Sequence, residues 1–173
     1  DITTTWNGTT WSNGAPYDKI VAVINGNYDT VTNGSLTCCS LSVNTGVVTT
    51  IGANTHITVT GDITVAGTLN VLNNGSLIQV DDSGINTGNI SYERVVSIRK
   101  SDYVYWSSPV NNFNVNGISP LTSPSYVLKW NPIAANTNGG FGNWMAAAGE
   151  IMVPGKGYIV RGPDSFTNTA QNF

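Results

Sequence analysis

The sequence predicts an all-β protein: a short parallel β-solenoid with about three strands per 20–22-residue coil, followed by a compact antiparallel β unit. Between Leu36 and Val80, short apolar–polar–apolar triplets recur, separated by turns rich in Gly, Asn and Thr. Every third triplet returns after 20 to 22 residues, which is typical of stacked solenoid coils. After Ile90 the repeat stops, and basic residues and prolines become frequent.

The triplets define the expected strands of the solenoid. In chain order they are Leu41/Val43, Thr49/Ile51, Ile57/Val59, Ile63/Val65, Leu69/Val71 and Leu77–Val80. Their spacing predicts coils over approximately 20–38, 40–60 and 62–80, with a further coil beginning near Ile90. In this register Thr64 stacks near Ser42, and Thr50 stacks near Asn70. An antiparallel sandwich with short hairpins is the competing architecture, but the triplets are shorter than the usual five or six residues of a strand, which favours the solenoid.

The chain outside the solenoid is expected to cover its ends, because a solenoid end carries unpaired backbone groups. We predict a cap segment over residues 1–19, which holds Trp6 and Trp11, a solenoid over 20–90 and an antiparallel domain over 91–173.

The antiparallel domain is predicted from three short strands and a turn. The strands are expected at Tyr126–Trp130, at Asn143–Met145 and at 157–161. Pro154-Gly155-Lys156-Gly157 is expected to form a tight turn between two hairpin arms.

Composition favours an extracellular protein. Charged residues make up 10% of the chain, against about 25% in an ordinary soluble domain. The net charge is −3 and the cations are scattered, which argues against nucleic acid as a partner. The longest apolar run, Ile20–Ile24, is too short to span a membrane. Cys38 and Cys39 are adjacent and provide no disulfide framework. We therefore expect a secreted or cell-surface protein that does not span the membrane.

Five aromatic residues of the last domain form the candidate glycan site. Tyr105, Trp106, Trp130, Trp144 and Tyr158 could offer a platform for stacking sugar rings. The alternative interpretation places them in the core, because an aromatic ring on a strand buries up to about 250 Å².

Asp81 and Asp82 form the one acidic cluster, with Ser83, Gly84 and Asn86 beside them. Their oxygens suit a hard cation such as calcium, although the spacing is not that of an EF-hand. The alternative is a solvated turn at the end of the solenoid. The sequence offers no catalytic residues, because it contains no Ser/His/Asp or Cys/His grouping and no evident carboxylate pair, so we expect a protein that is not an enzyme.

Several segments resemble a known group of proteins. They are TTWNGTTWSNGAP, INGNYDT, GSLTCCSLSVNTG, ITVTGDITVAGTLNVLNNGSLIQVDDSG, ISYERVVSIRKSDYVYWSSPV, YVLKWNP and MVPGKGYIVRGP. Together they resemble the N-terminal region of large secreted or surface proteins of flavobacteria and other Bacteroidetes, exported by the type IX secretion system. The resemblance implies a fragment of a longer, adhesin-like or surface-layer protein that meets the type IX secretion machinery during export. Asp29-Thr30-Val31 also resembles the short O-glycosylation acceptor of Bacteroidetes, which makes Thr30 a candidate for modification.

These observations lead to three functional hypotheses. The first is a non-enzymatic structural or adhesive module of a secreted cell-surface protein, with self-assembly through solenoid ends or edge strands as one mode. Its partners would be other surface or matrix proteins, or further copies of the chain. The second is a carbohydrate-binding module that uses exposed Trp and Tyr. The third is a polysaccharide-active β-helix enzyme, for which the fold alone is a weak argument.

Overall fold

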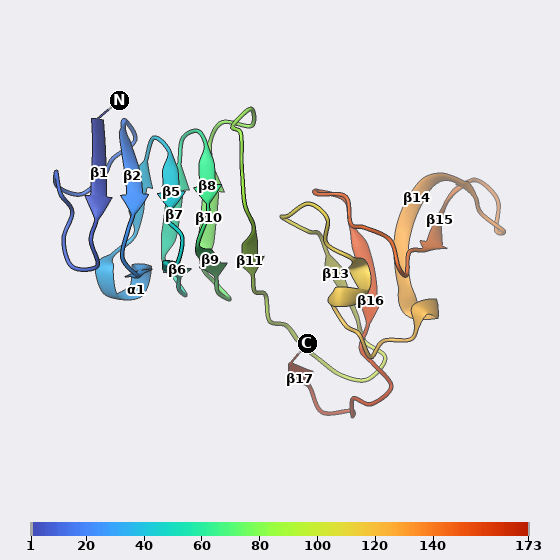
Figure 1. The fold of residues 1–173 in the computed structure, drawn as a ribbon. Coiled ribbons are helices and arrows are strands. Elements are labelled where there is room, and N and C mark those ends of the chain that lie inside the picture. The colour runs from blue at the N-terminus through green and yellow to red at the C-terminus, as the bar shows by residue number, and fades with distance from the viewer. Residues whose placement is uncertain (1, 173) are drawn as a thin grey trace. The chain divides into compact units, whose positions relative to one another are not determined.

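The computed structural model describes residues 2–172 and divides into two compact units, one ending at Arg94 and one beginning at Val95. The regular secondary structure of both units consists mainly of β-strands (Figure 1). We call them the solenoid unit and the antiparallel unit, and each is described by itself.

The strands of the solenoid unit are short and follow one another at regular intervals. They are β1 (Ile2–Trp6), β2 (Ile20–Ile24), β3 (Tyr28–Asp29), β4 (Leu36–Cys38), β5 (Leu41–Val43), β6 (Val48–Ile51), β7 (His56–Val59), β8 (Ile63–Val65), β9 (Thr68–Val71), β10 (Ser76–Gln79) and β11 (Ile90–Tyr92). A single helical turn, α1 (Thr30–Asn33), separates β3 from β4.

These strands form three parallel sheets, ordered β1-β2-β5-β8, β4-β7-β10 and β3-β6-β9-β11. Each complete coil gives one strand to each sheet, so that the unit is a parallel β-solenoid of about 5 turns. The predicted solenoid is confirmed and the antiparallel sandwich is wrong for this part of the chain. The predicted register is confirmed as well, because Ser42 pairs with Thr64 and Thr50 pairs with Asn70.

Inward side chains of successive coils stack into ladders that form the core. One ladder runs through Leu36, Ile57 and Leu77, and another includes Val43 and Val65. Leu36, Ile57, Val43 and Val65 are all buried. The middle residue of each apolar–polar–apolar triplet is more exposed and points outward. The period-2 alternation of the triplets therefore specifies which side of each strand enters the core.

The first segment of the chain does more than cover the solenoid, because β1 is itself a solenoid strand, parallel to β2. The chain then folds back along β1, where the Ser12 N–H donates to the Thr5 carbonyl at 2.9 Å. The Trp11 ring lies 5.5 Å from Trp6 and 5.7 Å from Tyr28. This segment therefore forms hydrogen bonds with the outer edge of β1. Its aromatic cluster covers the N-terminal end of the solenoid.

The antiparallel unit contains a four-stranded sheet, a two-stranded pair and two short 3-10 helices. Its elements are β12 (Ser97–Ile98), β13 (Tyr103–Trp106), η1 (Val115–Gly117), η2 (Pro124–Tyr126), β14 (Val127–Ala135), β15 (Phe141–Ala146), β16 (Tyr158–Arg161) and β17 (Gln171–Asn172). The sheet has the order β13-β16-β14-β15, and β12 pairs with β17. All of its pairings are antiparallel, as the sequence predicts.

One detail of the predicted connectivity is wrong. Residues 154–157 do form a turn, with the Lys156 N–H donating to the Val153 carbonyl at 3.1 Å, but this turn does not join two paired strands. The strand after it, β16, inserts between β13 and β14. The hairpin is instead formed by β14 and β15, where the Asn136 N–H donates to the Gly140 carbonyl.

Candidate functional site: an aromatic platform on the antiparallel sheet

The four-stranded sheet of the antiparallel unit has one face on the core and one face that carries exposed aromatic rings. Side chains on a strand alternate between faces, and directly paired residues share a face. Val127, Tyr158 and Val160 lie on the core face and are buried. Tyr105 is paired with Ile159 on the opposite face, and Trp130 is paired with Trp144 at the β14–β15 end of that face.

Tyr105, Trp130 and Trp144 come together on this second face, and we call them the aromatic platform. Their exposed fractions are 74%, 45% and 36%. The Trp130 and Trp144 rings are 5.2 Å apart in an edge-on arrangement, and the Tyr105 and Trp144 rings are 6.3 Å apart. The platform therefore runs from β13 to β15 across the sheet, and Ile159, which lies between them in the sheet, is buried.

A glycine holds one ring of the platform in place. A Cβ atom on Gly142 would lie 2.4 Å from the Trp130 ring, so the indole rests against the bare backbone of β15. Gly142 also has φ +101°, a conformation that other residues rarely adopt. The backbone of the β14–β15 hairpin at Gly142 consequently determines where the Trp130 ring lies.

The face that carries the platform has one charged residue, and that charge is already engaged. By alternation, Arg161 lies on this face, paired with Tyr103. Its guanidinium carbon lies 3.3 Å from the centre of the Tyr126 ring, and its Nη2 lies 2.7 Å from an Asp164 oxygen. Tyr103 is also exposed on this face and is an aromatic neighbour that the sequence interpretation missed, although its i, i+2 spacing from Tyr105 was the available signal.

Two of the five predicted glycan residues are not on the platform. Tyr158 is completely buried in the core, and its hydroxyl accepts a hydrogen bond from the Val153 N–H at 3.1 Å. Trp106 is half-buried and packs against the same core, on the opposite face from Tyr105. Both are corrected to core residues, because alternation along β13 and β16 turns them inward.

The Asp81–Asp82 segment forms a turn. The Asp81 carboxylate accepts hydrogen bonds from the Ser83 hydroxyl at 2.7 Å and from its N–H at 2.9 Å. These bonds lower the pKa of Asp81 below its ordinary value. Between residues 2 and 172, no three His, Cys, Asp or Glu side chains gather as metal ligands would. The calcium site at Asp81 and Asp82 stays a prediction.

The position of Thr30 in the fold does not suit a glycan acceptor. It is 1% exposed, because Asp29 caps the N-terminus of α1 and the helical turn directs Thr30 inward. Its hydroxyl oxygen accepts from the Gly52 N–H at 3.0 Å and shares a hydrogen bond with the Thr55 hydroxyl. A sugar on this oxygen does not fit the folded solenoid, so the structure corrects this assignment.

Asp29 and Asp62 stabilise turns of the solenoid, and Cys38 lies in its core. An Asp29 oxygen accepts from the Val31 N–H, and an Asp62 oxygen accepts from the Ile85 N–H at 2.7 Å. Cys38 is fully buried, and desolvation, with a smaller effect of Cys39, raises its pKa to about 12. Both cysteines are free thiols.

No helix within the described part of the chain is long and apolar enough to cross a membrane. By fold, the chain is a β-solenoid protein with an appended antiparallel sheet. It belongs to a family described as a domain of unknown function (DUF8693), whose model matches residues 1–173. No curated protein and no solved structure matches the chain.

Proposed function

We propose that this chain is a non-enzymatic adhesive module of a secreted cell-surface protein, and that the aromatic platform is its contact surface. The observation that carries the proposal is the gathering of Tyr105, Trp130 and Trp144 on one open sheet face. Clustered exposed apolar groups mark interaction sites, because leaving them in water is unfavourable.

The solenoid unit suits the role of a spacer. Its coils stack about 4.8 Å apart, so five turns extend over roughly 20 Å along the solenoid axis. Its outward positions hold small polar residues such as Ser42, Thr50 and Thr64, while the ladders fill the inside.

A surface location is part of the proposal. It is supported by the low content of charged residues and by the resemblance to type IX-exported proteins of Bacteroidetes. Other surface or matrix components would then be the partners.

The test is adhesion by the purified chain. Beads coated with the chain should be retained on at least one of three surfaces, coated with polysaccharide, matrix protein or bacterial cells, more strongly than uncoated beads. Tyr105→Ala should lower retention several-fold, because Tyr105 is the most exposed ring of the platform. Tyr17→Ala removes a half-exposed tyrosine of the solenoid unit and is the matched control. Equal retention of wild type and Tyr105→Ala would reject the platform as the contact surface.

A second candidate function, self-assembly, is favoured by the edge strand β10. Strand β10 ends its sheet, and none of the described residues up to Arg94 pairs with its outer edge. Ile78 and Val80 are exposed beside this edge. Edge strands of this kind pair with other chains unless they are protected. Light scattering over a concentration series tests this candidate: Ile78→Lys should abolish any association, and a wild type that is monomeric at all concentrations would reject it.

A further inference from the structure

We infer that the aromatic platform binds an uncharged polysaccharide, one whose sugar rings stack on Tyr105, Trp144 and Trp130 in succession. This inference rests on the proposed function and names its ligand class. It is carried by the chemistry of the rings, by the charge of the face and by the area that the platform offers.

The rings have the chemistry that a sugar requires. A pyranose ring has an apolar face of C–H groups and a rim of hydroxyl groups. Tyr and Trp match both, because each has a flat apolar face and one polar edge group. Within residues 2–172, no hydrogen bond engages the indole N–H of Trp130 or Trp144 or the hydroxyl of Tyr105. These groups are therefore available to sugar hydroxyls.

The charge of the face selects a neutral ligand. Arg161 is the one ionic group that alternation places there, and its charge is engaged by Tyr126 and Asp164. The chain's net charge of −3 comes from residues 1–94, whereas residues 95–173, which include the platform, carry five Lys or Arg and three Asp or Glu. The preference for a neutral ligand therefore depends on the platform face itself, where an anionic polysaccharide or a nucleic acid would meet no free cation.

The area of the platform favours a polysaccharide over a folded protein. The exposed parts of the three side chains amount to roughly 300 Å², given about 150–250 Å² for each large aromatic side chain. A stable protein–protein interface needs about 800 Å² from each partner. The Trp144 ring lies 6.3 Å from the Tyr105 ring and 5.2 Å from the Trp130 ring, so a short run of sugar residues could contact all three rings.

The platform is also organised before any ligand binds. Gly142 seats the Trp130 ring, Trp130 packs edge-on against Trp144, and Trp144 contacts Tyr105. Rings that are already held in place lose little conformational entropy on binding.

The experiment measures binding of the full chain to defined polysaccharides. Affinity electrophoresis in gels containing soluble neutral polymers (xyloglucan, mixed-linkage glucan, mannan, arabinoxylan) and anionic polymers (alginate, pectate) gives the affinity for each. Matrix proteins and bacterial cells are tested in parallel as binding surfaces. We expect retardation in at least one neutral polymer that persists when the salt concentration is raised, because no ion pair is formed.

Three platform variants and one control connect the binding to the platform. Tyr105→Ala and Trp144→Ala should each weaken binding about tenfold or more, the scale known for loss of one stacking ring. Tyr17→Ala should bind like the wild type. Trp144→Phe keeps a ring and should restore most of the affinity, which separates loss of stacking from loss of folding.

The outcomes distinguish the ligand from the function. Binding to anionic polymers alone, or neutral binding that is unchanged in both alanine variants, would overturn the inference. Adhesion to matrix proteins or cells without binding to any polysaccharide would overturn the inference but keep the adhesive function. A chain that binds none of these surfaces would overturn both.

Discussion

The two units bury their apolar residues in different ways, and this difference decides where a binding surface can lie. In the solenoid unit each inward residue stacks on its equivalent in the coil before it, so the core is one continuous set of ladders. In the antiparallel unit a smaller core lies behind one face of a single sheet. The other face of that sheet is left to Tyr105, Trp130 and Trp144. The stacked ladders make the solenoid unit a scaffold. A sheet with its core on one face only leaves its other face free for recognition.

The largest expected effect comes from breaking a ladder at its centre. Ile57 is completely buried between Leu36 and Leu77. Ile57→Ala should lower the free energy of unfolding of the solenoid unit by about 3–4 kcal/mol, through lost burial and the cavity left behind. Hydrogen exchange followed by mass spectrometry should show lost protection in peptides before Arg94.

Two matched variants sharpen this comparison. Ile78→Ala removes an outward, half-exposed side chain of the same sheet and should cost less than about 1 kcal/mol. Val160→Ala empties part of the antiparallel core and should affect peptides after Val95. Equal loss of protection in both units for Ile57→Ala would show that they unfold as one, contrary to the division of the core.

The sequence predicts the solenoid well because its signal is repeated. Each coil repeats the same pattern of apolar triplets. The assignment of an ambiguous position can therefore be corrected from the equivalent positions in neighbouring coils. β1 escaped prediction because its inward positions include Thr4, whose hydroxyl is satisfied by donating to the Gly14 carbonyl at 2.8 Å. The α1 turn escaped because one turn is too short to show a helical period.

The second expected effect is a loss of stability of the solenoid unit at alkaline pH. The pKa of Cys38 is raised from 9.0 to about 12, because burial disfavours the thiolate. Well below pH 9.0 the thiol is protonated in both the folded and the unfolded chain, and the full stability is present. As the pH rises above 9.0, the unfolded chain ionises first, so the solenoid should lose about 1.4 kcal/mol per pH unit at most.

Urea unfolding at a series of alkaline pH values measures this slope. The pKa of Tyr28 is also raised by burial, and its ionisation acts in the same direction. Cys38→Ala lowers the stability at every pH, since it leaves a small cavity, but it should flatten the slope. An unchanged slope in this variant would reject Cys38 as the cause.

A third, smaller effect concerns a polar atom inside a ladder. Thr49 is completely buried, and its hydroxyl has no hydrogen-bond partner among residues 2–172. Thr49→Val should therefore stabilise the solenoid by about 1 kcal/mol, since it removes an unsatisfied buried group at nearly constant volume. Thr30→Val is the contrasting variant and should destabilise, because it leaves the buried Gly52 N–H without its acceptor. The midpoints of urea unfolding for the two variants should move in opposite directions, and a destabilised Thr49→Val would show that its hydroxyl is satisfied.

The candidate site could be predicted in part. Residue type alone identified Tyr105, Trp130 and Trp144, but it could not separate them from Trp106 and Tyr158. That separation depends on which side of the sheet receives the core. The core side is set by Val115 and Met152, which come from segments outside the sheet and have no regular spacing to it.

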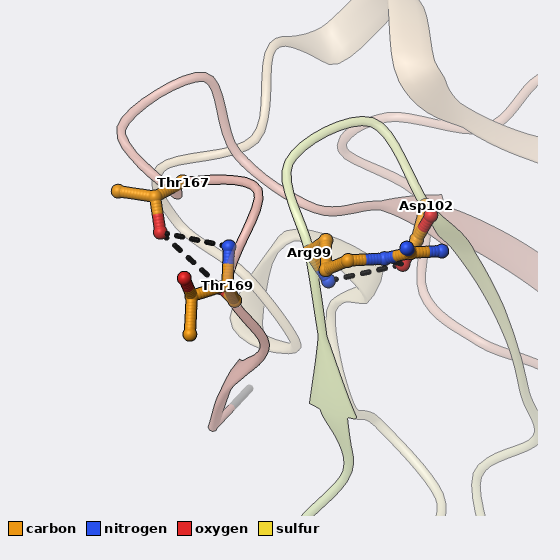
Figure 2. Close-up of polar contacts among 4 residues, drawn as sticks. All are labelled: Arg99, Asp102, Thr167 and Thr169. Atoms are coloured by element: carbon orange, nitrogen blue, oxygen red, sulfur yellow. Dashed lines mark hydrogen bonds and ion pairs between the residues drawn. The ribbon is translucent and has the colours of Figure 1, made fainter.

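The smallest expected effect lies at the turn that precedes β13. The Asp102 carboxylate accepts from the backbone N–H and the Nε of Arg99 at 3.1 and 3.0 Å, as Figure 2 shows beside the Thr167–Thr169 turn. The Lys100 N–H links the two turns by donating to the Thr167 carbonyl. The bonds from Arg99 lower the pKa of Asp102 below its ordinary 3.8.

Asp102→Asn should change the stability of the antiparallel unit only slightly at neutral pH, because the pair is exposed to solvent and the amide oxygen can still accept from the Arg99 N–H. A lowered pKa in the folded chain stabilises it above pH 3.8, and this contribution is lost as the pH falls. The difference in melting temperature between wild type and Asp102→Asn should therefore be small at neutral pH, shrink with added salt and vanish in acid. A large difference that resists salt would mean that this turn is buried against another surface, and the antiparallel unit would then have a second contact besides its aromatic platform.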